Sequence, residues 1–166
     1  MWKRRTFHEC AVELEGISNG FRSAYSGTDA NRAQDLERYS VQGVEILRIL
    51  ASAIRSEQDY GILGRVSTYV GSVRKKTDEA EINDMLQNYK PPYMLLENYE
   101  PLSLREGLNK IMHTNGMRSG FYADRSNHDL ILSGTDRGAS WVAVVSLVDL
   151  CRVIKSLPDA AITPMN

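Results

Sequence analysis

The stretch MRSGFYADRSNHDLILSGTDRGASWVAVVS, residues 117–146, contains three short runs rich in aromatic and aliphatic side chains. These runs are MRSGFYA (117–123), DLILSG (129–134) and SWVAVVS (140–146). The turn-forming segments DRSN and TDRGA separate them, and short apolar runs bounded by such segments are typical of β-hairpins. The sequence therefore predicts a three-stranded antiparallel meander.

Upstream of this stretch, apolar residues recur at the spacing of helices. The expected helices cover, in chain order, residues 5–24, residues 30–58, residues 62–76 with the basic RKK at the end, a segment starting at Thr77 or Asp78, and residues 103–113. The fourth of these must stop before Pro91-Pro92, because proline lacks a backbone N–H and restricts the residue before it. About five helices should therefore form an N-terminal bundle.

A last helix should follow the meander. Ser146 and Asp149 form a plausible cap, apolar residues continue at helical spacing to Leu157, and Pro158 lies past the end. We expect an α+β fold in a single domain, 1–166. Its helical part covers 1–116, the small sheet and last helix cover 117–158, and 159–166 form a frayed tail.

Composition excludes several classes of protein. Hydrophobic residues make up 42% and charged residues 25%, which is ordinary for a globular chain. Lysine and arginine number 20 against 21 acidic residues, so no bulk positive field attracts nucleic acid or a membrane. No apolar run approaches the roughly 18 residues of a membrane span, and we expect a cytoplasmic protein.

Cysteine and histidine usage gives no sign of a metal centre. Cys10 and Cys151 lie far apart on apolar stretches, and we expect buried free thiols. The three histidines are scattered singly, so we expect neither a metal nor a cofactor.

The segment LSLREGLNKIMHTNG, residues 102–116, has the most clearly marked helix boundaries. Ser103 and Glu106 predict a capping box, and Asn115-Gly116 predicts a left-handed stop. On this helix Arg105, Asn109 and His113 recur every four residues along the margin of the apolar face.

These three residue types could bind and cut an RNA phosphate without a metal. Arginine would stabilise charge on the phosphorus oxygens, an amide would orient the group, and histidine would take the proton of the ribose 2′-hydroxyl. The alternative is structural, because His113 in a last turn also suits the negative helix end, and Arg105 could pair with a nearby carboxylate.

Asn109-Lys-Ile-Met-His113 on a helix of a small protein resembles the signature of HEPN domains, an arginine and a polar residue followed three positions later by histidine. The resemblance implies a helical bundle, usually dimeric, whose paired helices form a composite ribonuclease site. It covers about a dozen residues, and it departs where Leu108 replaces the arginine, so the arginine role passes to Arg105.

Further contacts to RNA are expected around this row from Lys110, Arg118, Arg137 and Trp141. Trp141 and its aromatic neighbours could stack bases, or could instead pack the sheet against the helices. The GTDRGAS segment could cradle a phosphate, although a hairpin turn also explains it.

The segment LREGLNKIMH, with the hairpin after it, also resembles short proteins of bacterial mobile elements and phages. The sequence thus leaves two hypotheses: a homodimeric, HEPN-like RNA-binding protein or ribonuclease of a defence or toxin–antitoxin system, and a non-enzymatic interaction protein, such as a defence inhibitor, that binds another macromolecule.

Overall fold

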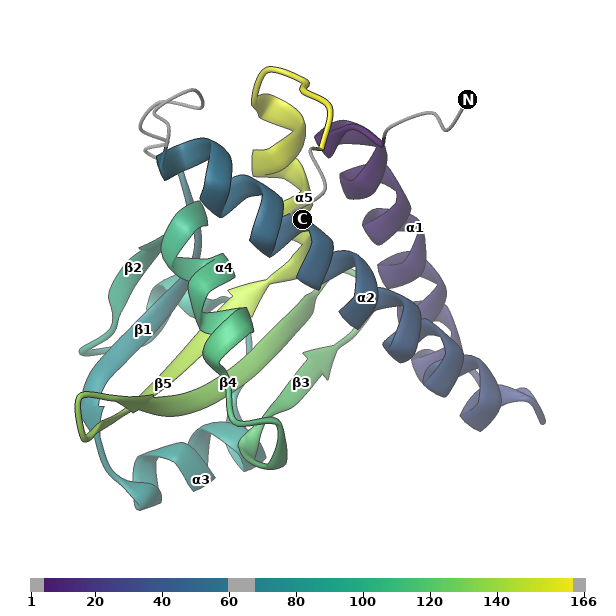
Figure 1. Cartoon of the computed structure of the whole chain (residues 1–166). Coiled ribbons are helices and arrows are strands. Elements are labelled where there is room, and N and C mark those ends of the chain that lie inside the picture. Colours follow the sequence, from purple (N-terminus) through teal and green to yellow (C-terminus); the bar gives the residue numbers. More distant parts are fainter. Residues whose placement is uncertain (1–4, 60–67, 163–166) are drawn as a thin grey trace.

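The computed structural model describes residues 5–59 and 68–162, and the side chains of 54–59 are not among the described ones (Figure 1). In chain order the elements are α1 (Phe7–Ser26), α2 (Arg32–Asp59), β1 (Tyr69–Thr77), α3 (Glu79–Asn88), η1 (Tyr93–Leu95), β2 (Glu100–Ser103), α4 (Leu104–His113), η2 (Gly116–Arg118), β3 (Gly120–Ala123), β4 (His128–Asp136), β5 (Ala139–Ser146) and α5 (Leu147–Ser156). The fold class is α+β, as predicted.

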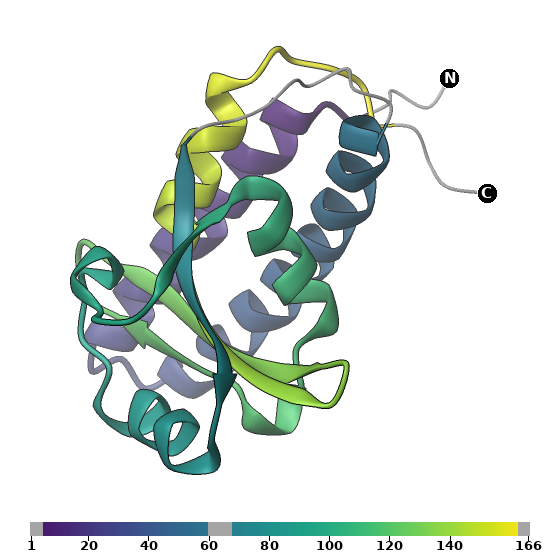
Figure 2. The same cartoon turned by 90° about the vertical axis from the view of Figure 1, so that its left-hand side faces the viewer.

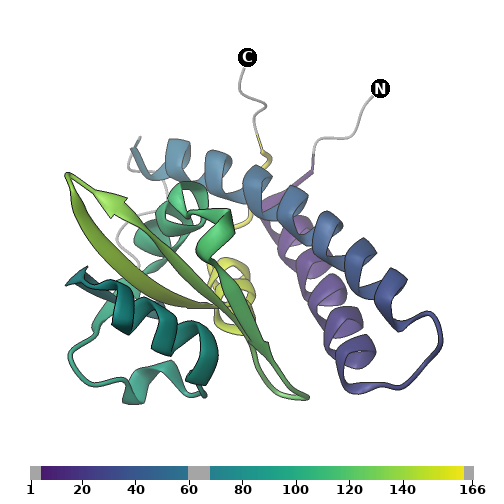
Figure 3. The ribbon, with the colours of Figure 1, turned by 90° about the horizontal axis from the view of Figure 1, so that it is seen from below.

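The five strands form one antiparallel sheet in the order β2-β1-β5-β4-β3. Its two faces are covered differently, with α3 on one side and the other helices opposite (Figure 3). Alternate residues of β5 face the two sides: Trp141 and Val145 pack with α1, α2, α4 and α5, whereas Val142 and Val144 pack with α3 and η1. The core therefore lies on both faces of the sheet.

The three strands predicted within residues 117–146 form as β3, β4 and β5, which pair in sequence order. The sheet has five strands rather than the predicted three, because β1 and β2 extend it beyond β5. Arg137 and Gly138 join β4 to β5 with φ angles of 51° and 80°. Two residues with positive φ make the hairpin connection whose twist matches that of the strands, and glycine adopts it without strain. GTDRGAS is thus a hairpin turn.

Several predicted helix starts are also confirmed. The Ser103 hydroxyl accepts a hydrogen bond from the N–H of Glu106 at 3.3 Å, and Ser146 caps α5 in the same way at 3.1 Å. Asp78 caps α3. These caps satisfy backbone donors that the first turn of a helix leaves unpaired.

The predicted third helix is wrong where the structure describes it, since Tyr69–Thr77 form strand β1; residues 60–67 lie outside the described part. β1 lies between β2 and β5, and all of Val70 to Val73 are buried. A strand covered on both faces loses the alternation that marks strands, and its apolar run resembles a helix. The predicted five-helix bundle therefore does not form. Residues 5–113 contain strands β1 and β2 in addition to helices.

The end of helix α4 and the C-terminal segment also differ from expectation. α4 stops at Thr114, which is extended with φ −68° and ψ 144°, rather than at a left-handed Asn115-Gly116, and the Asn115 side chain caps η2. The predicted frayed tail is ordered through Ile162, whose N–H donates to the Arg5 carbonyl at 2.8 Å. Backbone bonds to the start of the chain hold this segment in place.

α1 and α5 lie side by side in Figures 1 and 2, and each contributes one cysteine to the same buried core. Cys10 and Cys151 are free and buried, as predicted, and burial raises the pKa of each thiol. None of the described helices is long and apolar enough to span a lipid bilayer.

Candidate functional site

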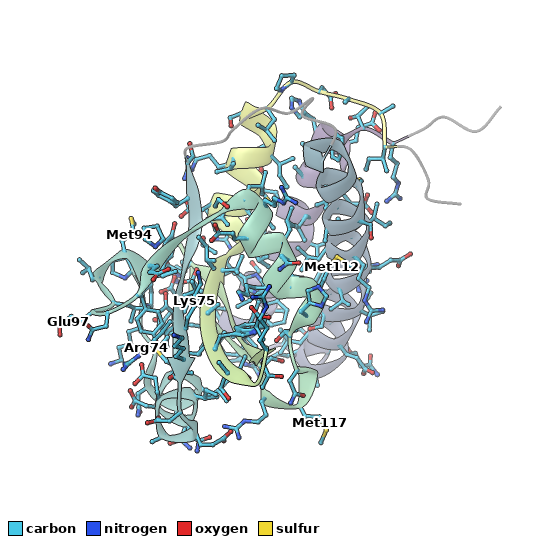
Figure 4. The ribbon with its side chains drawn as sticks, turned by 60° about the vertical axis from the view of Figure 1, so that its left-hand side comes forward. Arg74, Lys75, Met94, Glu97, Met112 and Met117 are labelled. Carbon is cyan, nitrogen blue, oxygen red and sulfur yellow. The ribbon has the colours of Figure 1, made fainter. Side chains whose placement is uncertain are left out.

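Arg105, Asn109 and His113 lie along one margin of α4, mostly on its solvent side. Leu104 and Leu108 point into the core, while Arg105 and His113 are exposed and Asn109 is half-buried. Figure 4 shows Met112, which is next to this margin, on the side of α4 nearest α2. Arg105 and His113 are eight positions apart, which corresponds to about 12 Å along the helix axis.

Lys110 and Trp141 contact each other. The ammonium of Lys110 lies 4.3 Å from the centre of the Trp141 ring, and desolvation lowers the pKa of this lysine. The indole is only 2% exposed, so it packs α4 on β5 and offers no free face to a base. The environment of Trp141 therefore fits a role in packing the sheet against the helices rather than in stacking bases.

The other two predicted RNA contacts lie on separate elements. Arg118 in η2 forms an ion pair with Glu79 and donates to the Asn83 side chain at 2.8 Å, which ties η2 to α3. Arg137 is exposed at the tip of the β4–β5 hairpin. The described cavities include none that these residues share with the α4 row.

A cavity of about 330 Å³ lies elsewhere, between α1, α2 and the β3–β4 edge of the sheet. Most of its wall is hydrocarbon or aromatic ring, contributed by Leu14, Ile17, Phe21, Tyr39, Val44, Leu47, Phe121, Leu130 and Leu147. A largely apolar cavity of this size with a few polar groups is the usual form of a small-molecule site.

Besides Tyr39, Ser40 and Ser119, the wall has two buried polar side chains that contact each other, Ser18 of α1 and His128 of β4. The Ser18 hydroxyl and His128 Nδ1 are 2.8 Å apart, and the two residues are 3% and 7% exposed. Burial, with a smaller contribution from the positive charge of Arg22, lowers the pKa of the His128 imidazole to about 4. The ring is therefore neutral at physiological pH.

Aromatic rings hold this imidazole in position. The Phe21 ring stacks on it with centroids 4.8 Å apart and planes 11° apart, and Phe121 meets it edge-on. Among the described residues none hydrogen-bonds His128 Nε2. A neutral imidazole carries one donor and one acceptor nitrogen, so Nε2 can make one more hydrogen bond.

Sequence reasoning missed this cavity. Ser18 and His128 are 110 positions apart, and each lies in an amphipathic segment where it resembles an ordinary core-margin residue. Their contact depends on how the α1–α2 hairpin docks on the sheet, which no local motif specifies.

Within residues 5–59 and 68–162, no three histidine, cysteine or carboxylate side chains lie close enough together to bind a metal ion. Comparison with known proteins found no match among protein-family models, curated proteins or solved structures.

Proposed function

We propose that this chain is a binding protein whose cavity between α1, α2 and β4 takes up a small, largely apolar organic molecule carrying one hydroxyl group. The observation that carries the proposal is the neutral, largely buried imidazole of His128 in a wall that is mostly apolar. Nε2 of this ring has no hydrogen-bond partner among the described residues, so a ligand hydroxyl can bind there in place of water.

The chemistry of the wall defines the ligand. Aromatic and branched side chains from both α1 and β3 favour a planar or branched hydrocarbon body through burial of apolar area. Ser18 occupies Nδ1, which leaves Nε2 for the ligand. A hydroxyl can both donate and accept, so it suits Nε2 in either tautomer of the ring.

Naphthalene and 2-naphthol form a matched pair of probes, because they differ only by the hydroxyl. In an NMR titration, both should shift the signals of cavity residues saturably, with 2-naphthol binding about fivefold more tightly, the value of one net hydrogen bond. His128→Phe should abolish this preference while keeping the ring stack on Phe21.

Two variants on α2 test the location. Ser40 is an exposed residue of the cavity rim, and Ser40→Trp should block both probes. Gln34 is exposed on the same helix away from the cavity, so Gln34→Trp should bind like the wild type. Absence of saturable shifts, or shifts centred elsewhere, would refute the proposal.

A second candidate is the RNA-phosphate site on α4. It is favoured by one observation: Arg105, Asn109 and His113 share one margin of α4, with the arginine and the histidine exposed. A cleft around the row would need a second molecule, in keeping with the homodimer that the HEPN resemblance implies.

RNA incubated with the protein and a chelator separates the two candidates. Metal-independent cleavage by the wild type, lost in His113→Ala and Arg105→Ala and kept in Glu106→Ala, would support the α4 site. Glu106 is exposed on the same helix and is the matched control. Intact RNA in every sample would exclude the ribonuclease hypothesis and favour a non-enzymatic binding protein.

A further inference from the structure

The outer side of α2 carries four exposed residues in a row: Glu37, Val41, Val44 and Arg48. The valines are 64% and 48% exposed. The spacing of four, three and four positions keeps all four within about 60° of one another around the helix axis. They form a narrow stripe, which we call the α2 seam.

Most of the α2 seam faces outward, and Val44 at its edge also lines the mouth of the cavity. Ile46 and Leu50 are buried on the opposite side of the helix, and α2 packs on α1 and α4. Figure 3 shows α2 with no described helix or strand on its outer side. Two exposed valines alone would be unremarkable, because single apolar residues are common on surfaces.

The charges at the two ends make the seam distinctive. Glu37 and Arg48 make no ion pair within the described part of the chain, whereas Arg38 on the same helix pairs with Asp35. The two unpaired charges are opposite and lie equally far from the midpoint of the seam. A seam with this symmetry is complementary to itself when it is turned end to end.

We infer that two copies of this chain form a homodimer by antiparallel packing of their α2 seams. A two-fold axis between positions 42 and 43 places Val41 against the partner's Val44 and Glu37 against the partner's Arg48. Each contact occurs twice, as in every two-fold interface. The 4-3-4 spacing is the one by which helices interdigitate, and valine is small enough for close packing.

A parallel pairing is excluded by the same charges, because it would set Glu37 against the partner's Glu37 and Arg48 against the partner's Arg48. The interface is small and its apolar part consists of valines, so we expect a dimer that dissociates on dilution.

Charge exchange tests the dimer. Sedimentation analysis over a concentration series should show a monomer–dimer equilibrium for the wild type. Glu37→Arg and Arg48→Glu should each raise the dissociation constant by about tenfold or more, since each replaces two attractions with two repulsions. The double variant Glu37→Arg/Arg48→Glu should restore the wild-type value, as should an equimolar mixture of the two single variants.

Both positions are exposed, so the variants should keep the wild-type circular dichroism and melting temperature. Val12→Lys is the matched control, because Val12 is 58% exposed on α1 and lies off the seam. A wild type that stays monomeric at the highest attainable concentration would overturn the inference. So would a double variant as weak as either single one, which would show that the two charges do not meet.

Discussion

The imidazole of His128 should make the folded protein lose stability as the pH falls from about 6.5 to about 4. In the unfolded chain a histidine titrates near pH 6.5, whereas burial lowers the pKa of His128 to about 4 in the fold. Between these values the unfolded state holds one more proton than the folded state. The free energy of unfolding therefore rises with pH across this window and falls on acidification.

The magnitude follows from the two values. The pKa of His128 differs between the unfolded chain (about 6.5) and the fold (about 4). At 1.36 kcal/mol for each pKa unit, acidification across this range lowers the free energy of unfolding by about 3 kcal/mol. The side chain is 7% exposed, so solvent screens this effect little. His128→Gln removes the titrating group and keeps a hydrogen-bonding partner for Ser18.

Urea denaturation followed by circular dichroism at pH 7 and pH 4 measures the effect. Carboxylates also titrate in this range, so the informative quantity is the difference between the pH-dependent losses of wild type and variant. The wild type should lose about 3 kcal/mol more than His128→Gln. His113→Gln, at an exposed position of α4, is the matched control for the substitution itself. Equal losses in wild type and His128→Gln would refute the reasoning.

The same denaturation assay checks three further expectations. A Cβ on Gly71 would lie 1.9 Å from the Val144 carbonyl oxygen, so Gly71→Ala should destabilise the protein by about 3 kcal/mol or more. Gly16 in α1 has nothing within 4 Å of such an atom, and Gly16→Ala should stabilise by about 0.5–1 kcal/mol; a loss there would contradict the packing of α1. Burial and a 2.6 Å hydrogen bond to Asp129 raise the pKa of Tyr89, so stability should fall above about pH 10, where the unfolded phenol ionises. Tyr89→Phe should reduce that slope by about 1.4 kcal/mol per pH unit, and an unchanged slope would show that the phenol is not shielded.

Local signals account for what the sequence predicted of the fold. Ser103 and Ser146 cap helices through their own side chains, and Arg137-Gly138 adopts the turn that its position between two strands favours. Each of these features is decided by neighbours within a few residues, so a single sequence carries the information.

β1 and the cavity depend instead on distant parts of the chain. β1 is a strand because β2 and β5 flank it, and its buried run has no alternation of its own to show this. The α4 row could be read from spacing, yet spacing does not tell which side of a helical margin another element will cover. His128 lacked any signal, since its partner Ser18 comes from the opposite end of the chain.

The cavity and the α2 seam share one residue, Val44. Val44 lies in the α2 seam and also lines the cavity, so a partner's α2 packed on this valine changes the mouth through which a ligand enters. Binding and dimerisation then share a free energy of coupling, and each must alter the other by the same factor. Titration of 2-naphthol at low and high protein concentration should accordingly give different affinities in the wild type and one common affinity in Glu37→Arg. Identical affinities in the dimeric and monomeric proteins would show that the seam and the cavity act independently.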